Sequence, residues 1–531
     1  MKTSINKRIN SILSFSLIIL LLLLSCKQES SNIESKARFQ EKYRPQVHFT
    51  PPSNWMNDPN GMVYHNGEYH LFYQHYPEAT HWGPMHWGHA ISTDLVHWEH
   101  MPIALYPDSL GYIFSGSAVV DINNTSRLGD KTNPPLIAFF TYHDMEAEKQ
   151  EKFFEIETQA IAYSLDNGRT WTKYSHNPVV NNPGIRDFRD PKVIWHEESA
   201  QWIMSIASGQ VIMFYTSPNC IDWTYASEFG EGVGNHDGVW ECPDLFPLVV
   251  EETGETKWVL IVNINPGGPA GGSATQYFVG DFDGKVFSSN QENTFWMDHG
   301  KDNYAGVTWS NAPDNRRILV GWMNNWQYAG KEPTEIWSGA ATFPRELGLV
   351  YYEDEYILTS NPVKEIRNLY GESTTLKNSE ITNNEAIFED IIFDKAPVEI
   401  VLTFDLDENK EHISSGKYGI TFKNSFGESF TIGYDNANEN FYVDRSNTTS
   451  EVFSEDFPSL QYVPFKRTTE NKIWRIIIDT SSIDFFTCNG KVSITNVVYP
   501  SELFDQIEVF AENGSIKIKE AKITELKSIW K

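Results

Sequence analysis

The chain has few cysteines, few basic residues and no long apolar run after its first 24 residues. Its 531 residues contain no Cys-x-x-Cys pair, which argues against zinc-ribbon and thioredoxin-like sites and against a disulfide framework. Lys and Arg number 42 against 71 Asp and Glu, so the net charge is −29. Such a chain repels phosphate backbones, and nucleic acid is therefore not an expected partner. The four cysteines are Cys26, Cys220, Cys242 and Cys488.

Aromatic residues, in contrast, are abundant. The chain has 17 Trp, 24 Tyr and 32 Phe in a composition that is 40% hydrophobic and 21% charged, which is typical of a globular protein. Aromatic side chains present large flat faces that stack on sugar rings as well as on bases. Because nucleic acid is disfavoured, we expect a neutral oligosaccharide or polysaccharide as the partner.

The first 26 residues have the pattern of a secretory signal. Basic residues precede an apolar run from Ile12 to Leu24 that is too short to span a bilayer comfortably. The run ends at Cys26 in a sequence that resembles a bacterial lipobox, so we expect a lipoprotein signal peptide over 1–26 with Cys26 acylated. An ordinary signal with an incidental cysteine is the alternative. The polar residues 27–42 would tether the protein to the outer membrane, on its periplasmic or cell-surface face, with no other membrane contact.

Residues 43–360 alternate short aromatic and β-branched runs with Gly, Asn, Asp and Pro clusters, which predicts strands and no long helix. One unit, made of a strand, a polar turn and a Trp, occurs at 91–98, 163–171 and 215–223. Repetition at about the spacing of propeller blades predicts a β-propeller. The second copy also resembles the Asp-box hairpin of sialidase-type propellers. A generic set of Ser-Asp-Gly turns in another β architecture is the alternative.

A second β region follows the predicted propeller. Residues 361–380 are polar and are interpreted as a linker. Residues 381–531 carry short apolar or alternating runs separated by hairpin signals such as Asn489-Gly490 and Asn513-Gly514, which predicts a β-sandwich. The fold class is therefore all-β, with a propeller followed by a C-terminal sandwich.

Three acidic residues stand out because aromatic, Gly, Pro or Arg residues surround them. Asp58 lies in the run WMNDPNG, where an ordinary Asx turn is the alternative. Asp190 follows Arg189, which would hold it ionised, and a structural Arg–Asp pair is the alternative. Glu241 lies in VWECPD, where desolvation would raise its pKa, although an Arg elsewhere could satisfy it. Hydrolysis of a glycosidic bond needs two such carboxyl groups, one ionised and one protonated.

These segments together resemble a known family. Residues 55–61 (WMNDPNG), 189–191 (RDP) and 241–243 (ECP) are similar to the signature motifs of family 32 glycoside hydrolases, which include invertases, inulinases and levanases. Accessory matches are 82–90 (WGPMHWGHA), 114–117 (FSGS) and 321–326 (GWMNNW). The resemblance covers about residues 43 to 531 and implies a five-bladed β-propeller with a C-terminal β-sandwich.

The resemblance also implies a role for each matching residue. Asp58 would be the nucleophile that forms a covalent fructosyl-enzyme, and Glu241 would be the general acid and then the base that activates water. Asp190 would bind fructosyl hydroxyls and stabilise the oxocarbenium-like transition state. The residues expected to line the fructosyl subsite are Asn57, Gln74, Trp82, Phe114, Ser115, Arg189 and Trp326. No cofactor is implied.

Double displacement would retain the anomeric configuration, which requires the two carboxyl groups to lie about 5–5.5 Å apart. The expected activity is exo-hydrolysis of levan or inulin with release of fructose, with sucrose as a further substrate. Endo-cleavage and transfer of fructose to a sugar acceptor remain alternatives. A non-catalytic fructan-binding lipoprotein is the alternative from another class, but binding alone needs no proton donor at Glu241. A sialidase would need an arginine cluster for a carboxylate substrate, which the motifs do not offer.

Other conspicuous residues receive a structural interpretation. His81, His86 and His89 lie close together, but no acid or cysteine accompanies them, so a pocket-lining or structural role is favoured over a metal site. The motifs around the acids contain four tryptophans, while several others mark the repeated hairpins. The four are Trp55, Trp82, Trp240 and Trp326.

Overall fold

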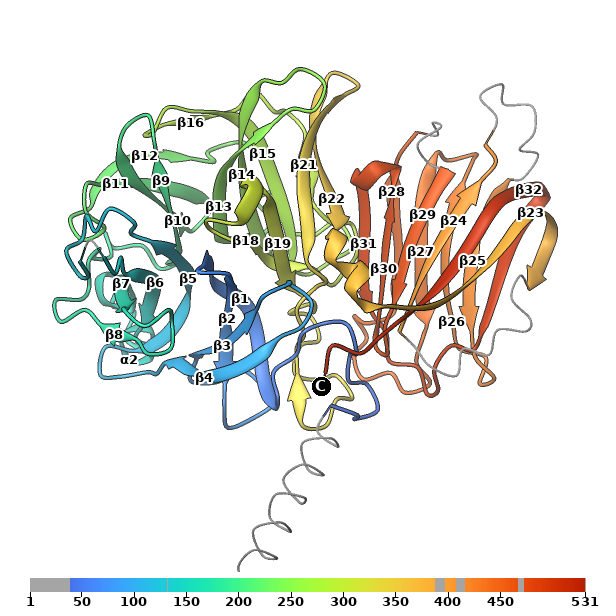
Figure 1. Ribbon diagram of the computed structural model, residues 1–531, viewed down its shortest axis with the longest axis horizontal. Helices are drawn as coiled ribbons and strands as arrows, with labels where there is room; N and C mark the ends of the chain where they lie inside the picture. Colours follow the sequence, from blue (N-terminus) through green and yellow to red (C-terminus); the bar gives the residue numbers. More distant parts are fainter. Residues whose placement is uncertain (1–38, 131, 387–396, 407–415, 467–471, 531) are drawn as a thin grey trace, which may run out of the picture.

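The computed structural model describes residues 39–130, 132–386, 397–406, 416–466 and 472–530. The predicted signal peptide with Cys26 lies outside these residues, as does most of the tether, so both stay predictions. Within the described ranges, no helix is long and apolar enough to cross a membrane. Figure 1 shows a propeller packed against a second all-β domain, which confirms the predicted fold class.

The described residues before 363 form five antiparallel blades. Blade 1 contains β1 (Asn54–His65), β2 (Glu68–Tyr76), β3 (His86–Ser92) and β4 (Glu99–Leu105), and blade 2 contains β5 (Tyr112–Val120), β6 (Leu136–His143), β7 (Glu157–Ser164) and β8 (Thr172–Lys173). Blade 3 contains β9 (Phe188–His196), β10 (Gln201–Ser208), β11 (Val211–Ser217) and β12 (Thr224–Phe229). Blade 4 contains β13 (Val239–Val249), β14 (Thr256–Asn265), β15 (Ala274–Phe282), β16 (Phe287–Ser288) and β17 (Phe295–Trp296), and blade 5 contains β18 (Tyr304–Thr308), β19 (Arg317–Trp322), β21 (Arg345–Tyr352) and β22 (Glu355–Pro362).

Short helices occupy only a few connections among the described residues. They are α2 (Met145–Lys149) and α3 (Phe153–Ile156) between β6 and β7, the 3₁₀ turns η1 (Pro313–Asn315) and η2 (Lys364–Leu369), and η4 (Cys488–Gly490). The strand β20 (Trp337–Ser338) follows blade 5 strand β19 in sequence but pairs in parallel with β1, which ties the last blade to the first.

The innermost strands form a closed ring. β1 contacts β5, β5 contacts β9, β9 contacts β13, β13 contacts β18, and β18 returns to β1. Each neighbouring pair of blades buries its own apolar cluster, such as the one around Phe139 and Trp202 between blades 2 and 3 and the one around Trp240 and Phe278 between blades 3 and 4. Burial of these clusters supplies the main driving force that holds the ring together.

The repeated sequence unit corresponds to the hairpin between the third and fourth strands of blades 1, 2 and 3. In each copy a serine hydroxyl hydrogen-bonds the Asp or Asn two residues later, and that side chain accepts backbone amides of the turn. The indole N–H groups of Trp171 and Trp223 each donate to a turn carbonyl at 3.1 Å. The repeat therefore marks blades, as predicted from the sequence.

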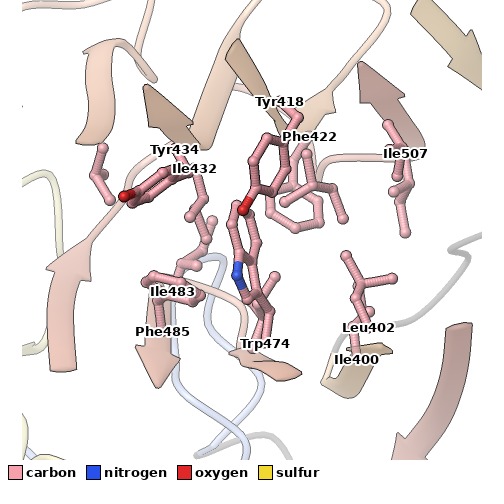
Figure 2. Close-up of a cluster of buried hydrophobic side chains, with 14 of the residues drawn as sticks. Ile400, Leu402, Tyr418, Phe422, Ile432, Tyr434, Trp474, Ile483, Phe485 and Ile507 are labelled. Carbon is pink, nitrogen blue, oxygen red and sulfur yellow. The ribbon is translucent and has the colours of Figure 1, made fainter. Parts of the chain in front are cut away.

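The C-terminal domain has two layers that share one long strand. Its strands are β23 (Tyr370–Ala386), β24 (Val398–Phe404), β25 (Lys417–Lys423), β26 (Ser429–Asp435), β27 (Asn440–Asn447), β28 (Leu460–Pro464), β29 (Ile473–Ile478), β30 (Ser482–Thr487), β31 (Val492–Val497) and β32 (Gln506–Leu526). The first part of β32 pairs with β25 and its last part pairs with β24, so one strand runs through both layers. Figure 2 shows the core between them, where the buried Trp474 packs against Tyr418 and Phe485.

The linker expected at 361–380 is shorter than predicted. Residues 364–369 form η2, and β23 begins at Tyr370 and pairs with β32. The polar residues of this segment are explained by its place at the edge of the sheet. Among the described strands β23 pairs with β32 alone, and much of its surface is exposed to solvent. Edge strands are commonly polar for this reason.

Buried charges join the two domains. His48, which precedes the propeller, contacts Asp479 through Nδ1 at 2.8 Å and Asp484 through Nε2 at 3.0 Å. Arg345 of β21 contacts Asp298 at 2.6 Å and Asp484 at 3.2 Å. Burial alone would lower the pKa of His48, but the two aspartates outweigh it and raise the pKa from 6.5 to about 9. His48 is therefore a charged link between the domains at neutral pH.

This link predicts a pH-dependent stability. Because the folded-state pKa is raised, the contribution of His48 is fully present below about pH 6.5 and is lost as pH rises through about 9. The two values differ by an amount worth roughly 3 kcal/mol. We expect the stability gap between the wild-type protein and His48→Gln, measured by urea denaturation, to be wide at pH 6 and to close towards pH 10. The exposed His176→Gln is the control, and a gap for His48→Gln that is constant with pH would contradict the assignment.

Candidate active site

The innermost strand of every blade carries a β-bulge near its first residues. At each bulge, two residues of the inner strand oppose one residue of the second strand. The pairs are Asn57-Asp58 opposite Gln74, Phe114-Ser115 opposite Thr141, Asp190-Pro191 opposite Ile206, Cys242-Pro243 opposite Val262, and Ala305-Gly306 opposite Gly321. Bulges redirect side chains and are frequent beside active sites. Here they occur where the ring of strands begins, and the predicted acids lie within or directly beside them.

Cys242 shows that the three acids share one space. Its amide donates to Asp190 Oδ2 at 2.9 Å, and its thiol lies 3.6 Å from Asp58 Oδ2, while Glu241 is its chain neighbour. Asp190 and Cys242 have left-handed backbone angles, with φ of 65° and 42°. Such angles are costly for residues other than glycine and are tolerated mainly at functional sites.

Asp58 is surrounded by hydrogen-bond donors. Ser115 Oγ donates to its Oδ2 at 2.6 Å, and Asn57 Nδ2 donates to its Oδ1 at 2.9 Å. The side-chain amide oxygen of Asn57 accepts the indole N–H of Trp55 at 2.7 Å, which fixes the direction in which the amide nitrogen points. The two donors hold the carboxyl group of Asp58 in one orientation. The half-buried Asp58 thus has the surroundings of a nucleophile.

Glu241 needs surroundings that differ from those of Asp58, because a general acid must carry a proton. Its Oε1 accepts from Arg189 Nη2 at 3.1 Å, and its Oε2 accepts the phenol of Tyr304. Burial raises the pKa of Glu241, the Arg189 charge and the Tyr304 hydrogen bond oppose this, and the charge of Asp58 adds to it, so that the pKa stays above its ordinary value. This direction agrees with the expected proton donor.

Arg189 differs from its expected role. Its guanidinium contacts Asp187 at 2.7 Å, Glu157 at 3.2 Å and Glu241 at 3.1 Å rather than the adjacent Asp190. Asp190 is not held ionised: burial first, and then the charges of Glu241 and Asp58, raise its pKa to about 8 against the Arg189 charge.

The remaining predicted subsite residues lie around these acids. Gln74 is buried opposite the Asn57-Asp58 bulge, and its amide nitrogen has no protein partner. Ser115 is buried and holds Asp58, as described above. The half-buried Phe114 stacks on His143 at 4.2 Å, and the more exposed Trp82 contacts it edge-on at 6.2 Å. These rings form an apolar rim beside the carboxylates.

The tryptophans of the motifs divide into two groups. Trp55 and Trp240 are fully buried and cannot touch a ligand. Trp240 packs on Phe278 and donates to the carbonyl of Asn235 at 2.8 Å, so it belongs to the scaffold. Trp82 is 36% exposed, and Trp326 is half-buried against Trp55 at 5.8 Å.

Two residues that matter in this geometry lack a local sequence signal. Tyr304 begins β18 in the ordinary apolar run NYAGVTW, and Glu157 is the first residue of β7. Glu157 accepts the amide of Phe188 at 2.6 Å as well as Arg189, and therefore orients the start of β9. Only the closed ring of strands brings Tyr304 to Glu241 and Glu157 to Arg189.

The channel is filled below the acids. Lys192 Nζ contacts Asp244 Oδ2 at 3.1 Å and the carbonyl of Thr308 at 2.7 Å, and the amide of Thr308 donates to the same Asp244 oxygen at 2.6 Å. All three residues are buried. A ligand can therefore reach the carboxylates only from the end of the channel where the inner strands begin.

No metal-binding group of His, Cys, Asp and Glu occurs among the described residues. His89 is buried and stacks on Phe72 at 4.1 Å, and His86 Nδ1 donates to the carbonyl of Pro84 at 2.8 Å, so both rings have structural contacts. His81 is exposed beside Trp82. Chemically, the site combines an ionisable nucleophile, a carboxyl of raised pKa and apolar walls, which suits acid-assisted displacement at a sugar carbon.

Comparison with known proteins agrees with this geometry. A levanase of Bacillus subtilis (strain 168) is 44% identical over 520 residues, covering 97% of this chain and 75% of the relative. An extracellular exo-inulinase of Aspergillus awamori is 36% identical over 526 residues, covering 93% of this chain and 96% of the relative.

Solved structures give the same picture. The exo-inulinase crystal structure from Aspergillus awamori has a TM-score of 0.83 at 35% identity and covers 93% of this chain and 100% of its own. A β-fructofuranosidase from Schwanniomyces occidentalis complexed with fructosyl-erythritol has a TM-score of 0.82 at 32% identity and covers 92% and 99% of the two chains. The model of the glycosyl hydrolases family 32 N-terminal domain matches residues 48–362, and that of the family 32 C-terminal region matches 365–525. With both domains matched and the three acids in one pocket, the chain belongs to glycosyl hydrolase family 32.

Proposed function

We propose that this protein is a retaining exo-β-fructosidase that removes terminal fructose from levan or inulin and also cleaves sucrose. One observation carries the proposal. Asp58 is held in place by two side-chain donors, while Glu241 in the same pocket has a pKa raised above its ordinary value, so Asp58 is oriented as a nucleophile and Glu241 is suited to donate a proton. The levanase and exo-inulinase relatives support the substrate class.

The mechanism follows from these surroundings. Glu241 protonates the departing glycosidic oxygen while ionised Asp58 attacks C2 of the fructosyl ring, which forms a covalent ester and releases the rest of the chain. Glu241, now a carboxylate, removes a proton from water, and the hydroxide attacks C2 and returns Asp58 to its free form. Asp190, with its raised pKa, presents a carboxyl group to the fructosyl hydroxyls and adds little charge to the ground state.

The filled channel favours exo-action. Lys192, Asp244 and Thr308 close the channel behind the acids, and a closed pocket suits the terminal residue of a fructan. An endo-acting enzyme needs a groove open at both ends of its cleavage point.

Product analysis tests this directly. We expect fructose as the sole early product from levan and from inulin in time-resolved chromatography, because a single sugar occupies the closed end of the pocket. Oligosaccharides appearing before fructose would overturn exo-action while leaving the hydrolase assignment intact. Absence of any reducing sugar from sucrose, levan and inulin would favour a non-catalytic binding protein.

Removing either catalytic carboxyl group should abolish most of the turnover. Asp58→Ala and Glu241→Ala are each expected to lower kcat by at least about a thousandfold with retained thermal stability. With a substrate whose leaving group needs no protonation, Glu241→Ala should accumulate fructosyl-Asp58, detectable by mass spectrometry. Asp281→Ala, an exposed carboxylate paired with Lys257 on blade 4, is the control. Near-wild-type turnover in either active-site variant would contradict the assignment.

Tyr304 should set the alkaline limb of the pH profile. Its hydrogen bond stabilises the Glu241 carboxylate and lowers the pKa of Glu241, so Tyr304→Phe should raise that pKa. Glu241 acts as an acid only when protonated, and the alkaline limb of kcat/KM should therefore move to higher pH by about half to one pH unit. Tyr142→Phe removes a comparable phenol–carboxylate bond, to Asp108, and should leave the limb in place. A shift to lower pH in Tyr304→Phe would contradict the proposed role.

A further inference from the structure

The loop between β19 and β20 connects the sandwich to the predicted sugar pocket. It carries Trp326, whose ring packs on Trp55 at 5.8 Å and on Trp322 at 4.8 Å. Trp55 in turn donates to Asn57, the neighbour of Asp58. The position of this loop therefore decides where the exposed face of Trp326 lies relative to the nucleophile.

Asn325 ties the near side of the loop to blade 4. Its Nδ2 donates to the carbonyls of Lys301 at 2.8 Å and Gly271 at 3.1 Å, and the amide of Trp326 donates to Ser273 Oγ at 3.2 Å. The carbonyl of Asn325 accepts the amides of Tyr328 at 3.1 Å and Ala329 at 2.9 Å. The loop is thus a compact turn in which Trp326 and Tyr328 are held as one unit.

The sandwich holds the far side of that turn. The buried Tyr328 donates its phenol to Asp302, and Arg445 of β27 donates to the phenol oxygen through Nη2 at 2.9 Å. Arg445 also contacts Asp302 through Nη1 at 2.6 Å. The guanidinium is fully buried and lies over the Phe457 ring at 4.2 Å. One arginine of the C-terminal domain therefore binds both Tyr328 and its partner Asp302.

We propose that Arg445 of the sandwich is a positioning residue for the sugar pocket, acting through Tyr328 to place the Trp326 wall. The inference rests on the proposed function, because Trp326 is a wall of the sugar pocket only if the protein binds a fructosyl group at these acids. Its physical basis is that a planar guanidinium sets the direction of each hydrogen bond, whereas a lysine ammonium does not. The sandwich thereby contributes to substrate binding without touching the substrate.

The decisive variant is Tyr328→Phe, which removes only the phenol oxygen and keeps the ring that packs on Phe457 at 5.4 Å. Loss of one buried hydrogen bond should loosen the turn and raise KM for sucrose roughly fivefold. We expect kcat to change less than about twofold, because Ser115 and Asn57 hold Asp58 independently of the loop. Arg445→Lys should show the same division between KM and kcat.

Arg345→Lys is the matched control. Arg345 is equally buried and also joins the two domains, but its partners Asp298, Asp484 and Thr495 lie outside the loop of Trp326. A purely structural role for Arg445 predicts that both arginine variants lose thermal stability and share one effect on KM. The positioning role predicts a stability loss in both and a raised KM only in Arg445→Lys.

A double-mutant cycle with Trp326→Ala completes the test. Trp326→Ala alone should raise KM roughly tenfold, and Tyr328→Phe should add nothing further in that background. Full additivity of the two changes, or an equal rise of KM in Arg345→Lys, would overturn the inference while Asp58→Ala still abolishes turnover. An unchanged KM in Trp326→Ala would overturn the subsite assignment and the inference with it. Turnover retained in Asp58→Ala would instead overturn the proposed function.

Discussion

Three carboxyl groups are buried together in one small space, and this shared burial is the constraint on which the rest of the site depends. Burial disfavours the charged forms and the neighbouring like charges add to this effect, so the pKa of Glu241 and that of Asp190 both rise. Arg189 relieves part of the repulsion, but Glu157 and Asp187 share its charge. The outcome is a pocket in which the pKa values of Glu241 and Asp190 stay above their ordinary values. A neutral sugar can enter such a pocket without the cost of bringing another charge into it.

The strands must accept unfavourable backbone conformations to bring these groups together. A regular strand sends successive side chains to opposite faces. The bulges at Asp58, Asp190 and Cys242 break this alternation, and two of these residues adopt positive φ. Such local costs of about 1–3 kcal/mol each are tolerable only where the surroundings are rigid. The apolar clusters between blades and the buried charges at the domain interface provide that rigidity.

The sequence indicates the parts of the molecule that have a local pattern. The hairpin units predict blades because their serine, aspartate and tryptophan form hydrogen bonds within a few residues of one another. Short motifs also indicate the three acids, because each acid and its flanking motif residues are contiguous in the sequence. Tyr304 and Arg445 have no such pattern, because each acquires its partner only when distant segments close the ring or dock the sandwich. The adjacency of Arg189 and Asp190 does not indicate an ion pair between them, because the guanidinium of Arg189 pairs with Glu157, Asp187 and Glu241.

The abundance of tryptophan has a narrower functional meaning than its number suggests. Among the tryptophans of the acid motifs, Trp55 and Trp240 are buried, and only Trp82 and Trp326 expose a face. The buried Trp55 acts indirectly, because its N–H orients the Asn57 amide that holds Asp58. Trp326 rests on that same indole and is held from the other side by the sandwich through Tyr328. Sugar stacking and the orientation of the Asp58 carboxyl therefore both depend on the stack of Trp55 and Trp326. A change in the C-terminal domain can alter substrate binding through this stack without touching the substrate.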